Sequence, residues 1–174
     1  AINDASRAFD VNAHLLLGIA AAESSFIPRN SPDGGRGLFQ ITRVPDSMLL
    51  QARKHLGIEK IALDNPRHNA FVAAATFKHY LAEMNNDLFL GLLAYNIGPA
   101  NGGLRFIMQQ YNANDFITIQ PYLQTLPRDY PIRVLSYSLA FQLWQKEGKL
   151  LAYEEGNNAA RIQRIGIPGL NTGL

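Results

Sequence analysis

The sequence predicts a mainly α-helical protein folded as a single domain, and three observations favour this class. The chain has 174 residues, which is enough for one domain with a hydrophobic core and short for two. Hydrophobic residues make up 47% and charged residues 17%, a globular rather than a disordered composition. Apolar residues recur at helical spacing along most of the chain. We expect a domain over residues 1–150 and an extended, glycine-rich tail over residues 151–174, packed on the domain or following it.

The first predicted helix begins at Asp10, ends near Ser24 or Ser25, and is apolar on nearly every side. Asp10 is a good N-cap residue, and the helix interior reads "HLLLGIAAA" before it reaches Glu23. A helix of this kind is usually buried on most sides. The sequence therefore predicts a carboxylate, Glu23, at the end of a buried helix.

A turn-rich loop follows over residues 27–36, with Asp33-Gly34 as its clearest turn signal. The next stretch, "RGLFQITRV", favours a strand or an irregular wall of a site. Pro131 is expected to start the last helix, which leaves Tyr130 at its entrance. Further helices are predicted between capping and breaking residues, over residues 45–57, 64–86, 87–96, 102–112 and 131–148.

Composition excludes several classes of function. The chain holds no cysteine, so it has no disulfide, thiolate metal site or cysteine nucleophile. The net charge is +2, and no Lys/Arg cluster is dense enough to indicate nucleic-acid binding. The four histidines lack zinc-binding spacing, and no phosphate-binding, dinucleotide-binding or serine-hydrolase motif occurs, so we expect no metal and no cofactor. No apolar stretch is long enough to span a bilayer, and no secretion signal is visible, which predicts a cytosolic protein or a processed or trimmed chain.

Glu23 is the strongest candidate for chemistry. A carboxylate near a helix C-terminus opposes the helix dipole, and burial also disfavours its charged form, so we expect a raised pKa. A rise of about two pKa units would cost roughly 2.7 kcal/mol at neutral pH. A carboxylic acid that stays protonated near neutrality suits general-acid catalysis. The alternative is a solvated carboxylate at a helix end, and the residues alone leave both interpretations open.

Two further patches could bind a ligand, although each also has a structural interpretation. In "GLFQIT", Gln40 can donate and accept hydrogen bonds with sugar hydroxyls and amides, and Phe39 can stack on a sugar ring. The alternative there is a strand with alternate residues buried. Tyr95 and Asn96 lie at a helix end before Gly98-Pro99, where they are well placed for a ligand, or where Asn96 serves as a C-cap.

Two tyrosines near the last helix form another candidate set. Tyr130 and Tyr137 are seven residues apart, so they would share a helix face if one helix covers both. Buried structural tyrosines are common, so a structural role in the core is favoured unless another observation points to a site.

Four motifs, in this order, resemble the catalytic domain of the bacterial soluble lytic transglycosylases, a family related to goose-type lysozyme. The family shows an apolar helix ending in Glu-Ser, then Gly-Leu-Met-Gln, then Ala-Tyr-Asn-Ala-Gly-Pro, then a tyrosine before an Arg-Val-Leu-like segment. The stretches that match are "ESSF" (23–26), "GLFQI" (37–41), "AYNIGP" (94–99) and "YPIRVL" (130–135), and "DNPRHNAFVAAATFKHYL" resembles the family's intervening helix. The similarity covers roughly residues 9–144 and implies a lysozyme-like fold.

The resemblance implies non-hydrolytic cleavage of the β-1,4 bond between N-acetylmuramic acid and N-acetylglucosamine in peptidoglycan. Glu23 would protonate the glycosidic oxygen, while the substrate's N-acetyl group stabilises the anomeric centre. Glu23 would then take the proton of the C6 hydroxyl as a 1,6-anhydro ring closes, and Tyr130 would orient it. The residues expected to bind substrate are Ser24, Ser31, Phe39, Gln40, Tyr95, Asn96 and Tyr137.

The chain departs from the family pattern in several places. Phe39 replaces the usual Met and Ile97 the usual Ala, and the segment between Glu23 and Gln40 is about one residue shorter than usual. "LPRDY" lacks the glutamate that often precedes the family's tyrosine, which leaves Tyr137 as an alternative for the role given to Tyr130.

Two other functions remain open from the sequence. A lysozyme-like or chitinase-like hydrolase would need a second carboxylate, for which Asp33 and Asp46 are the nearby candidates. A non-catalytic glycan-binding module would keep the fold without the chemistry. For the transglycosylase interpretation we expect peptidoglycan glycan strands as the partner, a monomer, and a periplasmic or envelope location with the leader or anchor absent from this sequence. An envelope-machinery partner, or a phage-borne or secretion-system-associated form, also fits the motifs.

Overall fold

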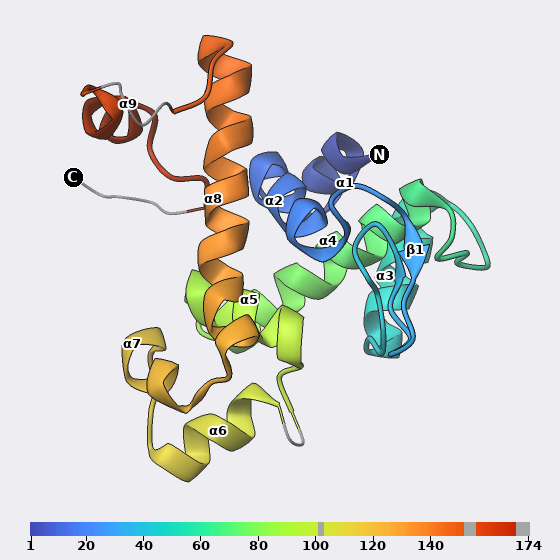
Figure 1. Ribbon diagram of the computed structural model, residues 1–174. Helices are drawn as coiled ribbons and strands as arrows, with labels where there is room; N and C mark the ends of the chain where they lie inside the picture. The colour runs from blue at the N-terminus through green and yellow to red at the C-terminus, as the bar shows by residue number, and fades with distance from the viewer. Residues whose placement is uncertain (101–102, 152–155, 170–174) are drawn as a thin grey trace.

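The computed structural model describes residues 1–100, 103–151 and 156–169, and helices dominate this part of the chain (Figure 1). Its helices are α1 (Ile2–Phe9), α2 (Ala13–Ser24), α3 (Asp46–Leu56), α4 (Pro66–Glu83), α5 (Leu88–Ile97), α6 (Leu104–Tyr111), α7 (Phe116–Ile119), α8 (Thr125–Glu147) and α9 (Asn158–Ile165). A short 3-10 helix, η1 (Gln120–Tyr122), follows α7, and strands β1 (Arg29–Asn30) and β2 (Arg36–Gly37) form an antiparallel pair. The predicted mainly α fold class is confirmed.

The N-terminal segment differs from the prediction. Asp10 does not cap α2; it ends α1 in the left-handed conformation, with φ 51°. Asn12 is the N-cap of α2, because its side-chain oxygen accepts hydrogen bonds from the backbone N–H of His14 at 2.9 Å and of Leu15 at 3.2 Å. A short helix, α1, therefore precedes α2, and the sequence did not predict it.

The middle helices begin and end close to the predicted positions. Asn65 caps α4 by accepting from two backbone N–H groups, and Pro66 occupies its first turn. Asp87 caps α5 by accepting from Leu90 N at 3.0 Å. Gly57 ends α3 with φ 66°, a conformation that favours glycine.

The helices pack around a central apolar core. α4 contacts α1, α3 and α5, while the long helix α8 runs across both α2 and α5 (Figure 1). The core is filled by buried aliphatic and aromatic side chains, among them Leu16, Ile19, Phe77, Leu92 and Val134. No helix in the described residues is long and apolar enough to cross a membrane.

Helix α8 begins earlier than the sequence indicated. It starts at Thr125, so Pro131 lies inside the helix and both Tyr130 and Tyr137 belong to it. Proline lacks the N–H that an interior position donates, which is why sequence reasoning places it at a helix start. The expectation that Tyr130 stands at the helix entrance is therefore wrong.

The C-terminal segment is not simply extended. The described residues 156–169 contain helix α9, and the rest of the predicted tail, 152–155 and 170–174, lies outside the described residues. Arg161 Nε donates to Glu147 Oε2 at 2.7 Å, and Gln142 Nε2 donates to Ile165 O at 3.0 Å. These contacts attach α9 to the C-terminal half of α8.

Candidate active site

Glu23 and Tyr130 meet where the C-terminal end of α2 crosses α8. The Tyr130 hydroxyl donates a hydrogen bond to Glu23 Oε1 at 2.6 Å, although 107 positions separate them in the sequence. Tyr130 is only 1% exposed, and burial raises its pKa well above the usual range, so its hydroxyl stays a neutral donor. Helix α8 thus presents a fixed donor to the carboxyl group of Glu23.

The surroundings of Glu23 favour its neutral form. Burial, the largest cause, raises the pKa of Glu23 from 4.5 to about 7. The hydrogen bond from Tyr130 and the positive charge of Arg133 lower this pKa, whereas the negative charge of Asp33 raises it. Near neutral pH both protonation states of Glu23 are therefore populated, in the direction expected from the sequence.

The meeting of the two helices depends on Gly18. A Cβ at this position would lie 2.1 Å from Ser138 Oγ and 2.4 Å from the backbone oxygen of Val134, both on α8. Any larger residue would push α2 and α8 apart. Because Glu23 lies at the end of α2 and Tyr130 on α8, this close approach sets the geometry of the pair.

The hairpin after α2 folds the chain back toward Glu23. β1 and β2 pair with Arg29 opposite Gly37 and Asn30 opposite Arg36. Gln40 follows with φ 46°, and its side-chain Nε2 donates to Arg29 O at 2.8 Å and to Gly37 O at 2.7 Å. The side chain is thereby held against the hairpin at the edge of the groove.

Asn69 on α4 holds the segment from Arg36 to Phe39 in place, although no motif in the sequence pointed to it. Its Oδ1 accepts from Phe39 N at 2.9 Å, and its Nδ2 donates to Arg36 O at 2.9 Å. Asn69 is fully buried on α4, and a Cβ at Gly37 would lie 2.6 Å from its Nδ2. A polar residue within the alanine-rich face of a core helix was the signal that could have found it.

Phe39 and Ser24 do not face the groove. Phe39 is 0% exposed and packs in the core, so the expectation that it stacks on a sugar ring is wrong; its backbone oxygen instead accepts from the Tyr95 hydroxyl at 3.1 Å. Ser24 is buried, and its Oγ donates to Leu38 O at 2.8 Å. Both residues support the wall rather than line it.

A groove of about 330 Å³ opens at Glu23, within the range of volumes that hold small ligands. It brings together five of the predicted site residues, which are Glu23, Ser31, Gln40, Tyr95 and Asn96. It is also lined by Asp33, one of the two candidates for a second carboxylate, and by Arg29, Gly35 and Thr42, for which the sequence predicted no role. Three of these come from the turn-rich loop, whose composition predicts turns but not which side chains face a cavity.

Tyr137 stands apart from this groove. It lies on α8 two turns beyond Tyr130 and is 42% exposed. The structure therefore places the hydroxyl of Tyr130, and not that of Tyr137, on Glu23.

Asp33 is a second carboxylate in the groove. The Ser31 hydroxyl donates a hydrogen bond to Asp33 Oδ1, which lowers the pKa of this exposed carboxyl group. Ser31 also accepts from Gly35 N at 2.9 Å, so it ties the loop together. Among the described residues, no cluster of three or more His, Cys, Asp or Glu side chains could hold a metal ion.

Comparison with known proteins identifies the family. A model of the Transglycosylase SLT domain matches residues 1–118. The chain belongs to this family. The matched part of the SLT domain contains Glu23, the hairpin and the Tyr95-Asn96 pair, while Tyr130 lies beyond it. The predicted resemblance to the soluble lytic transglycosylases is confirmed, and a search of curated proteins returned no match.

Solved structures show that the SLT domain has the lysozyme-like fold expected for it. An inactive mutant of lytic transglycosylase Slt from Pseudomonas aeruginosa matches with a TM-score of 0.64 and 21% identity, over 86% of this chain and 24% of that one. The 70-kDa soluble lytic transglycosylase of Escherichia coli matches with a TM-score of 0.63 and 19% identity, over 88% and 26%. A 70-kDa soluble lytic transglycosylase in complex with bulgecin A gives 0.63 and 18%, over 87% and 25%. The chain thus spans about a quarter of the length of these proteins.

Proposed function

We propose that the chain is a lytic transglycosylase catalytic domain that cleaves the β-1,4 bond between N-acetylmuramic acid and N-acetylglucosamine in peptidoglycan without water. The observation that carries this proposal is the environment of Glu23. Its pKa is raised to about 7, a buried tyrosine donates to it at 2.6 Å, and it opens into a groove lined by polar side chains. Membership of the SLT family supports the same conclusion.

Glu23 acts first as an acid. It gives its proton to the glycosidic oxygen as the bond from that oxygen to C1 of the muramic acid breaks, and the N-acetyl oxygen bonds to C1 in its place. The C6 hydroxyl then attacks C1, the bond to the N-acetyl oxygen breaks, and Glu23 recovers a proton from that hydroxyl. The product is a 1,6-anhydro sugar. One group can serve in both steps because a pKa near ambient pH leaves neither protonation state strongly disfavoured.

Tyr130 supports the charged form of Glu23 between these steps. A hydrogen bond to a carboxylate is stronger than one to a neutral acid, so the Tyr130 hydroxyl stabilises Glu23 after it has lost its proton. Ser31, Gln40, Tyr95 and Asn96 bind the sugar hydroxyl and acetamido groups along the groove.

Hydrolysis is the second candidate, because Asp33 lines the same groove and its negative charge raises the pKa of Glu23. Asp33 could activate a water molecule on the opposite face of the sugar, as the base of an inverting glycosidase does. That reaction would give a reducing-end sugar. A non-catalytic glycan-binding module is the remaining alternative and would give no product.

Mass analysis of digested cell-wall sacculi tests the proposal. The wild-type protein should release muropeptides that end in the anhydro sugar, one water lighter than the hydrolytic products. Glu23→Gln should release none and still bind glycan strands, whereas Tyr137→Phe, an exposed change on the same helix as Tyr130, should leave the products unchanged. Reducing-end products would establish hydrolysis instead, and lysis by Glu23→Gln would remove Glu23 from the mechanism.

The substrate determines the expected surroundings of the protein. Peptidoglycan lies outside the cytoplasm, so we infer a periplasmic or cell-envelope location, with the domain working as a monomer. A partner from the envelope machinery, or a phage or secretion-system context, would bring it to the wall.

A further inference from the structure

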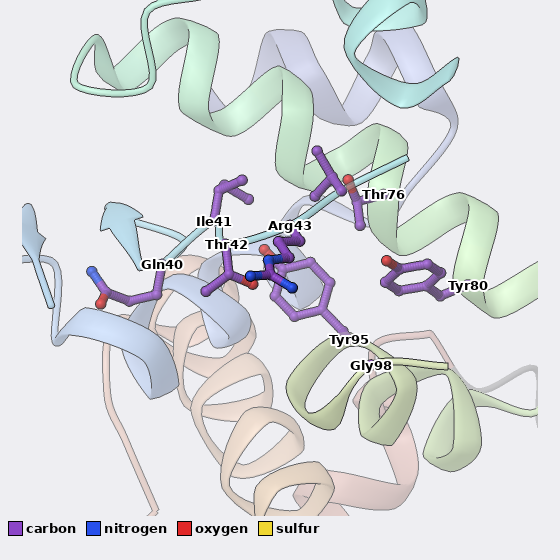
Figure 2. Close-up of a pocket in the computed structure, with 9 residues that line it drawn as sticks. Gln40, Ile41, Thr42, Arg43, Thr76, Tyr80, Tyr95 and Gly98 are labelled. Atoms are coloured by element: carbon purple, nitrogen blue, oxygen red, sulfur yellow. The ribbon is translucent and has the colours of Figure 1, made fainter. Parts of the chain in front are cut away.

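A second pocket adjoins the groove and takes no part in the proposed chemistry (Figure 2). Gln40, Thr42 and Tyr95 line both cavities, so the two lie next to each other. The pocket continues between the chain after Gln40 and helix α4, where Arg43, Thr76 and Tyr80 line it. A substituent on a sugar in the groove could therefore reach it.

Two hydroxyl groups at this pocket lack a hydrogen-bond partner. Tyr80 is 6% exposed, and its hydroxyl end is turned toward the segment that carries Thr42 and Arg43 (Figure 2). Within the described residues this hydroxyl makes no hydrogen bond, and the same holds for the buried Oγ1 of Thr76. Of these two groups, only Thr76 Oγ1 is fully buried. The Tyr80 hydroxyl is accessible at the pocket and free to donate to a ligand.

Arg43 supplies a positive charge at the pocket. It is exposed and forms no ion pair with any residue in the described ranges. Glu83, one turn after Tyr80 on α4, faces Arg105 at 3.8 Å and His79 at 3.5 Å. Burial and the negative charge of Glu83 both raise the pKa of Tyr80, so its hydroxyl stays a neutral donor. Of the side chains that line the pocket, Arg43 alone carries a charge, and the hydroxyl-bearing Thr42, Thr76, Tyr80 and Tyr95 line it too.

We propose that this pocket binds a carboxylate carried by the glycan strand, through the guanidinium of Arg43 and the hydroxyls of Tyr80 and Thr42. The inference rests on the proposed peptidoglycan substrate, whose muramic acid bears a lactyl group on O3. That group ends either in a free carboxylate or in a stem peptide with carboxylates of its own. Arginine pairs with carboxylates through two parallel hydrogen bonds, and tyrosine and threonine hydroxyls donate to the same oxygens.

Binding measurements in the Glu23→Gln background, which should not cleave, separate the contributions. Three ligands are compared: peptide-free strands with free lactyl carboxylates, the same strands with those carboxyl groups converted to methyl amides, and peptide-bearing strands. The carboxylate strands should bind about 10-fold more tightly than the amide strands, as expected for a charge-assisted hydrogen bond. Arg43→Gln should abolish this preference, and Tyr80→Phe, which keeps the ring and the packing, should reduce it to about 3-fold.

Lys54→Gln, which removes one positive charge on α3 away from both cavities, should keep the full preference and so controls for net charge. If the peptide supplies the carboxylate, Arg43→Gln should weaken binding of the peptide-bearing strands and leave the affinity for both peptide-free ligands unchanged. An equal loss for all three ligands would overturn the proposal and point to a neutral acetamido group as the occupant. Unchanged affinities in Arg43→Gln would overturn it too.

The outcomes separate this inference from the proposed function. Charge-selective binding together with wild-type products that lack the anhydro sugar would overturn only the proposed reaction. Anhydro products without charge-selective binding would overturn only the proposal that the pocket binds a carboxylate.

Discussion

Replacing Glu23 by Gln should make the protein more stable, by an amount that grows with pH. Glutamine imitates the protonated acid and can still accept from the Tyr130 hydroxyl. The pKa of Glu23 is about 7 in the folded protein and 4.5 for an ordinary glutamate. The folded state thus holds the proton more tightly than the unfolded chain, and ionisation of Glu23 costs stability as the pH rises between these values.

The size of the effect follows from the pKa of Glu23. Below pH 4.5 the carboxyl group is neutral in both states, and the two proteins should have nearly equal free energies of unfolding. At pH 6 the variant should be more stable by about 2 kcal/mol, and above pH 7 the difference should level off at about 3 kcal/mol.

Urea unfolding followed by circular dichroism, from pH 4 to pH 8, measures this difference. Glu59→Gln is the matched control, because this carboxylate is exposed and outside the groove, and its effect should stay within about 0.5 kcal/mol at every pH. A difference for Glu23→Gln that is constant with pH, or that shrinks as the pH rises, would refute the reasoning that burial holds Glu23 in its neutral form.

Further predictions follow from the same contacts. Tyr130→Phe removes a hydrogen bond that lowers the pKa of Glu23, so the descending limb of the kcat–pH profile should move to higher pH and kcat should fall about 10- to 100-fold; a shift to lower pH would contradict this. Asp33→Asn removes a like charge and should move that limb to lower pH, without changing the anhydro product unless Asp33 is the base for water. Gly18→Ala should lower the free energy of unfolding by about 1–3 kcal/mol in urea titrations. Adding Ser138→Ala should restore only part of this loss, because the new Cβ also clashes with the backbone oxygen of Val134. Asn69→Ala leaves the buried backbone N–H of Phe39 without a partner, while Arg36 O keeps its bond from Ile41 N, so the change should cost about 1–3 kcal/mol and raise KM; an unchanged KM would show that the groove wall does not depend on Asn69.

Local signals in the sequence were enough to predict most helices. Asn65 and Asp87 cap α4 and α5 close to the predicted starts of these helices, because a cap is decided by the few residues around it. Asp10 misled for the same reason: it is a good cap, but Asn12, two residues later, makes the hydrogen bonds. Pro131 misled in another way, since the packing of α8 against α2 and α5 stabilises a helix that propensity alone would start later.

The site was predicted less completely, because side-chain direction depends on backbone geometry that the sequence does not display. Gln40 adopts a positive φ, which breaks the simple alternation of a strand and leaves Phe39 in the core. Asn69 is far from the motifs in sequence, and only the folded chain shows that it holds them. The loop residues Arg29 and Gly35 carry no local signal for facing a cavity.

The close contact at Gly18 divides the site into a stiff part and a compliant part. Glu23 and Tyr130 lie on two long helices in backbone contact, so their separation changes little when the surroundings move. Gln40 and Ser31 lie on a hairpin of two-residue strands, which can deform at much lower cost. The wall can therefore adjust to a bulky polymer while the proton donor keeps its alignment, so changes in the hairpin should alter how tightly a strand is held before they alter the rate of bond cleavage.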